Sequence, residues 1–105
     1  MTVKEINSSN FKEEVLNSKK PVVIDNFAVW CGPCQSMKPI FKELSEEMKE
    51  IKFVSVDVDE SGDIATQYGV RSIPTFILLK NGKVITQFVG GMSKAQLKEK
   101  IKSNL

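Results

Sequence analysis

The chain has 105 residues, of which 41% are hydrophobic and 27% charged, and this is the size and balance of one globular domain spanning residues 1–105. The net charge is +2, from 15 basic and 13 acidic residues without a basic block, which argues against nucleic acid as a partner. The sequence opens without the apolar run of a signal peptide and contains no apolar stretch of membrane-spanning length, so we expect a cytoplasmic monomer that does not engage membranes.

The first part of the chain predicts two strands with a helix between them. Residues 3–6 are expected to form a short first strand. Asn10, followed three residues later by Glu13, is typical of a helix start. The run 21–27 is apolar and rich in β-branched residues, which predicts a strand buried on both faces of a sheet.

A long amphipathic helix is predicted after Pro33. Its apolar residues recur every three or four positions, while lysines and glutamates fill the other face. Pro39 lies inside this pattern, so a kink is expected there. The alternation over 53–58 predicts a third strand, and 64–68 a short helix that ends at Gly69. The apolar residues of the long helix are Met37, Ile40, Phe41, Leu44 and Met48.

The last third of the chain predicts a hairpin and a final helix. Residues 75–79 form a buried strand, the Asn-Gly dipeptide at 81–82 is a strong hairpin signal, and 84–89 form the returning antiparallel strand. Ser93 and Gln96 have the spacing of a capping box, which marks a helix start. The apolar face of this helix is expected to consist of Leu97, Ile101 and Leu105.

The predicted order of elements is therefore β-α-β-α-β-α-β-β-α. Alternating strands and helices indicate an α/β fold with a central mixed sheet, mostly parallel, and helices on both of its faces. The hairpin adds an antiparallel edge to that sheet.

The chemistry of the chain is restricted by its two cysteines and its lack of histidine. Without histidine there is no Cys–His or Ser–His–Asp catalysis. Cys31 and Cys34 lie between the strand 21–27 and the long helix, and cysteines three apart in a first helical turn are close enough to form a disulfide. Free N–H groups at the helix N-terminus would stabilise a Cys31 thiolate.

The two residues between the cysteines suit this position. Gly32 lets the backbone turn without a clash, and Pro33 is favoured in a first helical turn, where its missing N–H costs nothing. Three interpretations of the pair remain open from the residues alone: a redox couple, two buried free thiols, or half of a zinc site.

Four segments resemble the thioredoxin family, in the family's order and spacing along the whole chain. They are V-I-D-N-F-A-V-W-C-G-P-C at 23–34, V-R-S-I-P-T at 70–75, K-N-G at 80–82 and V-G-G at 89–91. The resemblance implies a thioredoxin fold and a protein-disulfide reductase without a bound cofactor or metal. Its partners would be disulfide-containing proteins as substrates, and a flavin-dependent, NADPH-using thioredoxin reductase as electron donor.

The resemblance also implies roles for individual residues. Cys31 matches the attacking cysteine, Cys34 the resolving cysteine, and Asp25 the buried acid beneath them. The apolar flanks of Asp25 independently favour burial and a raised pKa. A surface that binds substrate would consist of Trp30, Gly32, Pro33, Ile73, Pro74 and Gly90. Among these, Trp30 matches an exposed aromatic, Pro74 a cis proline, and Ile73 a residue that offers its backbone to substrate.

Two positions depart from the usual pattern of the family. The residues after the buried acid commonly read Phe-Trp, but here they are Asn26 and Phe27, so a polar side chain stands where an apolar one is usual. The strand 53–58 often carries a lysine near the acid, and Ser55 occupies that place here. We therefore expect no compensating positive charge beside Asp25.

Two other functions are compatible with these residues. One is a thiol oxidase or isomerase of the same fold, which the Gly32–Pro33 dipeptide disfavours because it places no charge between the cysteines. The other is a non-enzymatic metal-binding or interaction module, in which two chains would supply four thiolates.

Overall fold

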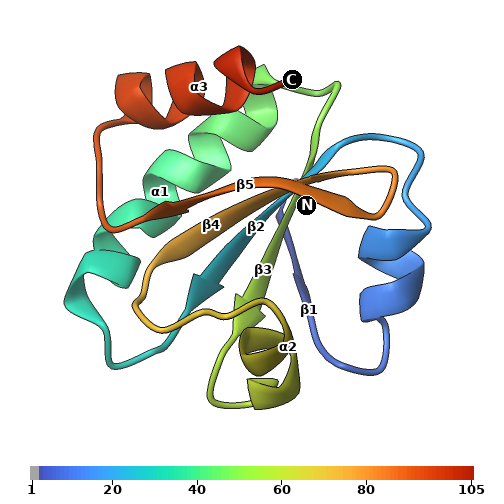
Figure 1. The fold of residues 1–105 in the computed structure, drawn as a ribbon. Helices are drawn as coiled ribbons and strands as arrows, with labels where there is room; N and C mark the ends of the chain where they lie inside the picture. Colours follow the sequence, from blue (N-terminus) through green and yellow to red (C-terminus); the bar gives the residue numbers. More distant parts are fainter. Residues whose placement is uncertain (1–2) are drawn as a thin grey trace.

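A five-stranded mixed sheet, with strand order β1-β3-β2-β4-β5, crosses the computed structural model, which describes residues 3–105 (Figure 1). β1 and β2 run parallel to β3, while β4 runs antiparallel to β2 and to β5. The predicted mixed sheet is confirmed, and its antiparallel pairing reaches one strand further inward than the hairpin itself. The strands are β1 Val3–Ile6, β2 Val22–Phe27, β3 Lys52–Asp57, β4 Thr75–Lys80 and β5 Lys83–Val89.

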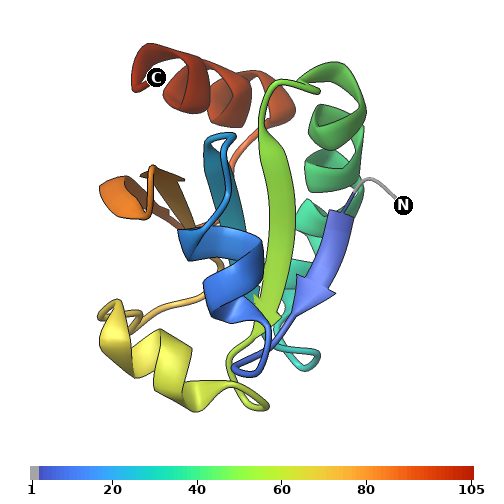
Figure 2. The same cartoon turned by 90° about the vertical axis from the view of Figure 1, so that its right-hand side faces the viewer.

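Helices cover both faces of the sheet. α1 (Gly32–Glu47) and α3 (Lys94–Ser103) pack on one face, and α2 (Gly62–Gln67) and the short π-type helix η1 (Lys12–Leu16) on the other (Figures 1 and 2). α1 stays continuous through Pro39. Within residues 3–105, no helix is long and apolar enough to cross a membrane.

The two faces bury separate hydrophobic clusters because successive strand residues point to opposite sides. In β2, Val23 packs with Phe41 of α1 and Leu97 of α3, whereas Ile24 packs with Ile64 of α2. All six residues of β2 are buried, which confirms the predicted two-sided strand. β2, the strand that precedes the cysteines, is therefore packed on both of its faces.

The local signals at the hairpin and at α3 are confirmed. Asn81 and Gly82 both have left-handed φ angles, of 54° and 77°, as a tight hairpin turn requires. Gly82 also passes close to η1, where an added Cβ would stand 3.1 Å from the carbonyl oxygen of Leu16. The Ser93 side chain accepts from the Gln96 N–H at 3.1 Å, and the Gln96 side chain accepts from the Ser93 N–H at 2.9 Å.

Two helix details are wrong. The Asn10 side chain does not cap a helix but accepts a hydrogen bond from the Asn7 N–H at 2.8 Å, so it closes the preceding turn. The backbone of Asn10 still starts the helical bonding, because its carbonyl accepts from the Glu14 N–H at 2.9 Å, and η1 itself runs from Lys12. Leu105 is not on the apolar face of α3, because the helix ends at Ser103 and Leu105 is 48% exposed. The Asn104 side chain donates to the Lys100 carbonyl at 2.7 Å and closes that end.

Candidate active site

Cys31 and Cys34 are joined by a disulfide at the point where β2 passes into α1. The chain turns after β2, and the Cys31 N–H donates to the carbonyl of Ala28 at 3.2 Å. Cys31 is then the N-cap residue of α1, and the Cys34 N–H points at its sulfur at 3.2 Å. The predicted place of the pair, at the N-terminus of a helix with Pro33 in its first turn, is confirmed.

The two sulfurs are not equivalent. Cys34 is fully buried, at 0% exposure, whereas Cys31 retains 5% and sits where the backbone N–H groups of α1 converge. Partial positive charge at a helix N-terminus favours a thiolate over a thiol. Cys31 and Cys34 therefore differ both in exposure and in their place relative to the N-terminus of α1.

The loop before β4 lies against Cys31. The Ile73–Pro74 peptide bond is cis, as predicted, and the Ile73 carbonyl oxygen lies 3.9 Å from the Cys31 sulfur. The Gly90 N–H donates to the carbonyl of Pro74 at 2.8 Å, and the φ angle of Gly90 is 96°, in the region that favours glycine. Three residues far from Cys31 in sequence are thereby brought to one place.

The predicted aromatic lies on the surface next to the cysteines. Trp30 is 70% exposed, and its indole Nε1 donates to a carboxylate oxygen of Asp59 at 2.8 Å, which orients the ring. Val29 and Val89 are also more than half exposed, beside Trp30 and Gly90 in the chain. Sequence reasoning missed both valines, because apolar residues near strand ends are more typical of a core.

Reduction should change the fluorescence of Trp30. It is the only tryptophan of the chain, and a neighbouring disulfide can quench indole emission. We expect emission to rise when dithiothreitol reduces the wild type. A Cys31→Ser/Cys34→Ser variant should give no response to dithiothreitol, and an unchanged wild-type spectrum would contradict the prediction.

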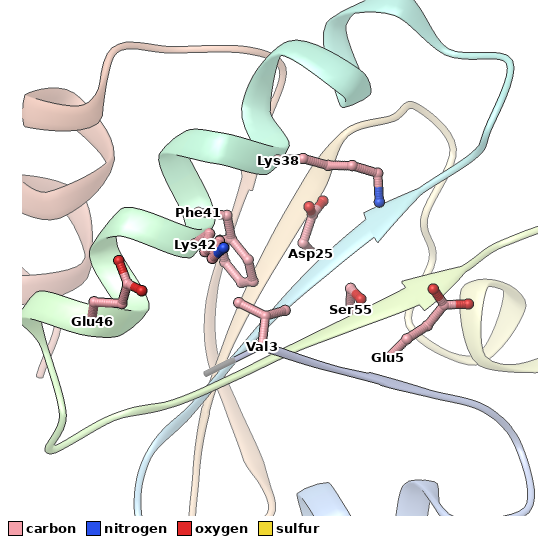
Figure 3. A pocket seen from close by; sticks show the side chains of 8 residues that line it. All are labelled: Val3, Glu5, Asp25, Lys38, Phe41, Lys42, Glu46 and Ser55. Carbon is pink, nitrogen blue, oxygen red and sulfur yellow. The ribbon is translucent and has the colours of Figure 1, made fainter. Parts of the chain in front are cut away.

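Asp25 is buried as predicted. It is 1% exposed, and its Oδ1 has no hydrogen-bond partner among residues 3–105. Burial raises the pKa of Asp25 to about 7, while the positive charge of Lys38 acts in the opposite direction. In the β2–β3 register Asp25 lies opposite Ser55. A pocket of about 470 Å³ between the sheet and α1 is lined by Val3, Glu5, Asp25, Lys38, Phe41, Lys42, Glu46 and Ser55 (Figure 3).

Lys38 corrects the expectation that no positive charge lies near Asp25. It comes from α1 instead of β3, one turn after Cys34, and reaches over the ring of Phe27, with Nζ 3.7 Å from the ring centroid. Figure 3 shows its side chain and that of Asp25 in the same space between β2 and α1. The spacing of four residues from Cys34 was the available signal, but a lysine on an amphipathic helix ordinarily faces solvent.

Removing the Lys38 charge should raise the pKa of Asp25 further. Lys38→Met keeps a long side chain over Phe27 but ends the attraction that favours the carboxylate. NMR titration of the Asp25 carboxyl carbon measures the shift. Lys42→Met, on the same pocket, is the matched control and should leave the titration nearly unchanged. Equal shifts in both variants would contradict a specific effect of Lys38.

Carboxylates elsewhere form one cluster that resembles a cation site within residues 3–105. Ligand oxygens of Glu5, Asp57 and Glu60 lie within 4.8 Å of one another. The cluster contains no cysteine, and two of its three residues are exposed. It has no evident part in chemistry at the disulfide.

A disulfide pair that begins a helix and contacts the loop of a cis proline is the arrangement of a thiol–disulfide oxidoreductase. Comparison with known proteins then identifies the family. The thioredoxin family model matches residues 2–103. Thioredoxin 1 of Nostoc sp. is 39% identical over 102 residues, covering 96% of this chain and 95% of that protein.

Other relatives agree. The thioredoxin of Mycoplasmoides gallisepticum is 40% identical over 100 residues, covering 95% of this chain and 100% of that protein. Thioredoxin Y1, chloroplastic, of Arabidopsis thaliana is 41% identical over 97 residues, covering 91% of this chain and 56% of that protein. The chain belongs to the thioredoxin family, and its Cys31–Cys34 pair is the redox-active disulfide of a thiol–disulfide oxidoreductase.

Proposed function

We propose that this protein is a general protein-disulfide reductase, built as a single domain, in which Cys31 attacks and Cys34 resolves. The observation that carries the proposal is the asymmetry of the pair. Cys31 caps α1 and is slightly exposed, whereas Cys34 is fully enclosed. In this proposal a substrate disulfide would reach the first of these sulfurs and not the second.

The reaction proceeds in two exchanges. The Cys31 thiolate forms a bond to one substrate sulfur, and the substrate S–S bond breaks, so that the other substrate sulfur leaves as a thiolate and takes a proton from water. Cys34 then gives its proton to the Asp25 carboxylate, directly or through water, and its sulfur attacks that of Cys31. When the mixed disulfide breaks, the second substrate sulfur leaves as a thiolate and takes the proton held by Asp25, directly or through water. The substrate has then gained two electrons and two protons, Asp25 is again a carboxylate, and the enzyme holds the Cys31–Cys34 disulfide.

Asp25 suits this acceptor role because of its environment. A carboxyl group with a pKa of about 7 is partly ionised at neutral pH and is still basic enough to take a proton. An exposed aspartate, with a pKa near 3.9, would be a much weaker base.

Substrate would bind across the surface around Cys31. Trp30 and the glycines Gly32 and Gly90 would give it a largely apolar and sterically open character, and Pro33 would keep the cysteine loop stiff. Pro74 is buried and would support this surface through the Ile73–Pro74 segment. The backbone of Ile73 would pair with an extended substrate segment. Few side chains would contact the substrate in this arrangement, which fits a reductase that accepts many proteins.

The electron donor in this proposal is an NADPH-dependent thioredoxin reductase containing flavin, and the site of action is the cytoplasm, where the protein would work as a monomer. One relative is a chloroplast protein, so the compartment needs its own measurement. Imaging of the tagged native chain tests it, and the donor is tested by NADPH consumption with the purified reductase.

The reduction potential separates a reductase from an oxidase or isomerase. Thioredoxins have reduction potentials of about −270 mV, and protein disulfide isomerase has one of about −180 mV. The uncharged Gly32–Pro33 dipeptide favours the lower value, since it gives the Cys31 thiolate no added cation. Titration in glutathione or dithiothreitol buffers measures the potential, and a value near −180 mV would favour the isomerase. Stoichiometric metal in protein purified without chelator would instead favour the metal-binding module.

A further inference from the structure

Asn26 is a buried polar residue in the middle of the central strand. It is 0% exposed, lies next to Asp25 in β2, and is paired with Thr75 in β4 and Val56 in β3. Within the part of the chain that the structure describes, its Oδ1 has no hydrogen-bond partner. A buried polar atom without a partner costs stability, and an apolar side chain of similar size would avoid that cost.

Among the described residues, the side-chain amide of Asn26 has one hydrogen-bond partner, and that partner belongs to the loop beside the disulfide. Nδ2 donates to the carbonyl oxygen of Thr75 at 3.0 Å. Thr75 is the first residue of β4 and directly follows the cis bond at Pro74. The side chain of Asn26 is therefore bonded to the residue at which the Ile73–Pro74 segment enters the sheet.

Two other hydrogen bonds hold the same segment. The Thr75 hydroxyl donates to the carbonyl of Ser72 at 2.5 Å, and the Gly90 N–H donates to the carbonyl of Pro74 at 2.8 Å. Ser72 is exposed and Ile73 half-buried, whereas Pro74 and Thr75 are buried, so packing holds the segment only at its β4 end. Asn26 supplies the one anchor that comes from the side chain of a central strand.

We propose that Asn26 is a positioning residue for substrate binding, which holds residues 72–75 so that the Ile73 backbone is presented to a protein substrate. The inference rests on the proposed function, because it concerns the surface assigned there to substrate. It explains why a polar side chain is kept where it leaves one atom unpaired. An anchor that serves binding should affect substrate affinity, whereas a purely structural residue should affect only stability.

Asn26→Leu tests this inference. The change removes the unpaired oxygen but also takes the Nδ2 donor away from the buried Thr75 carbonyl, so the two effects on stability oppose each other, and urea unfolding first establishes that the variant is folded. The KM for insulin reduction should rise about three- to tenfold, the range that follows from losing one neutral hydrogen bond. The rate with a small aromatic disulfide, dithiobis(nitrobenzoate), should not change, because that molecule does not need an extended backbone pairing. The reduction potential should also stay the same.

Val56→Ala is the matched control. Val56 is the β3 neighbour of Asn26, is equally buried and does not touch the loop by a hydrogen bond. It should lower stability and leave the KM for insulin unchanged. If leucine does not fit, Asn26→Ala is judged by the same criteria.

The outcomes are distinct. An unchanged KM in a folded Asn26 variant would overturn the inference, as would an equal loss of rate with insulin and with the small disulfide, or a shifted potential. A wild type that does not reduce insulin would instead refute the proposed function, and this inference with it.

Discussion

Cys34→Ser should accumulate as a covalent complex with its substrate, and Cys31→Ser should not. In the first variant the Cys31 thiolate still attacks, but no second sulfur can break the mixed disulfide. In the second variant the remaining sulfur is enclosed, at 0% exposure, and has no access to substrate. Both variants should reduce insulin at the rate of the buffer alone.

Non-reducing gel electrophoresis with mass spectrometry measures the trapped complex. The double variant Cys31→Ser/Cys34→Ser is the control and should trap nothing. Equal trapping by the two single variants would show that both sulfurs reach substrate, and the proposed division of roles would be wrong.

Asp25→Asn should make the oxidised protein more stable at neutral pH. The folded pKa of about 7 lies above the unfolded value near 3.9, so the native state keeps this proton longer than the unfolded chain does. Stability therefore falls as pH rises from about 4 towards 7, and above 7 the full penalty of about 4 kcal/mol persists. An amide cannot ionise, and we expect it to recover about 2 to 4 kcal/mol of this at pH 8.

Urea unfolding of both proteins between pH 4 and pH 8 measures this effect. The difference in unfolding free energy should be small at pH 4 and grow as the pH rises. Glu46→Gln, an exposed carboxyl-to-amide change on the same pocket, is the control and should stay within about 0.5 kcal/mol of the wild type.

The same Asp25→Asn change should slow insulin reduction, because Cys34 loses its proton acceptor. General-base catalysis is worth about 10²-fold or more, which sets the expected scale. If Asp25→Asn is more stable than the wild type and reduces insulin at the same rate, burial of Asp25 destabilises the fold and the residue has no catalytic role. A destabilised variant with an unchanged rate would make it an ordinary structural residue.

Most of the fold could be predicted from local patterns in the sequence. The β-branched run of β2 predicted burial on both faces, and the capping box at Ser93 predicted the start of α3, because each signal acts through neighbours in the chain. Pairing between β2 and β4 was not predictable in the same way. It depends on how the chain crosses the sheet, which no local pattern encodes.

The candidate site also contains some residues whose positions local patterns predicted and others whose positions they did not. Cys31 and Cys34 are three residues apart, so their proximity followed from helical geometry. Pro74 and Gly90 were placed near them only by resemblance to a family. The charge of Lys38 near Asp25 was not predicted. It depends on a long side chain that lies over Phe27, and tertiary packing and cation–π attraction determine that position.

NADPH-coupled reduction of insulin, with a thioredoxin reductase present, tests the central claim most directly. Wild type should support continuous NADPH consumption that depends on both insulin and the reductase, while Cys31→Ser, checked for folding by circular dichroism, should support none. Turnover by Cys31→Ser comparable to that of the wild type, or no turnover by a folded wild type, would contradict the account.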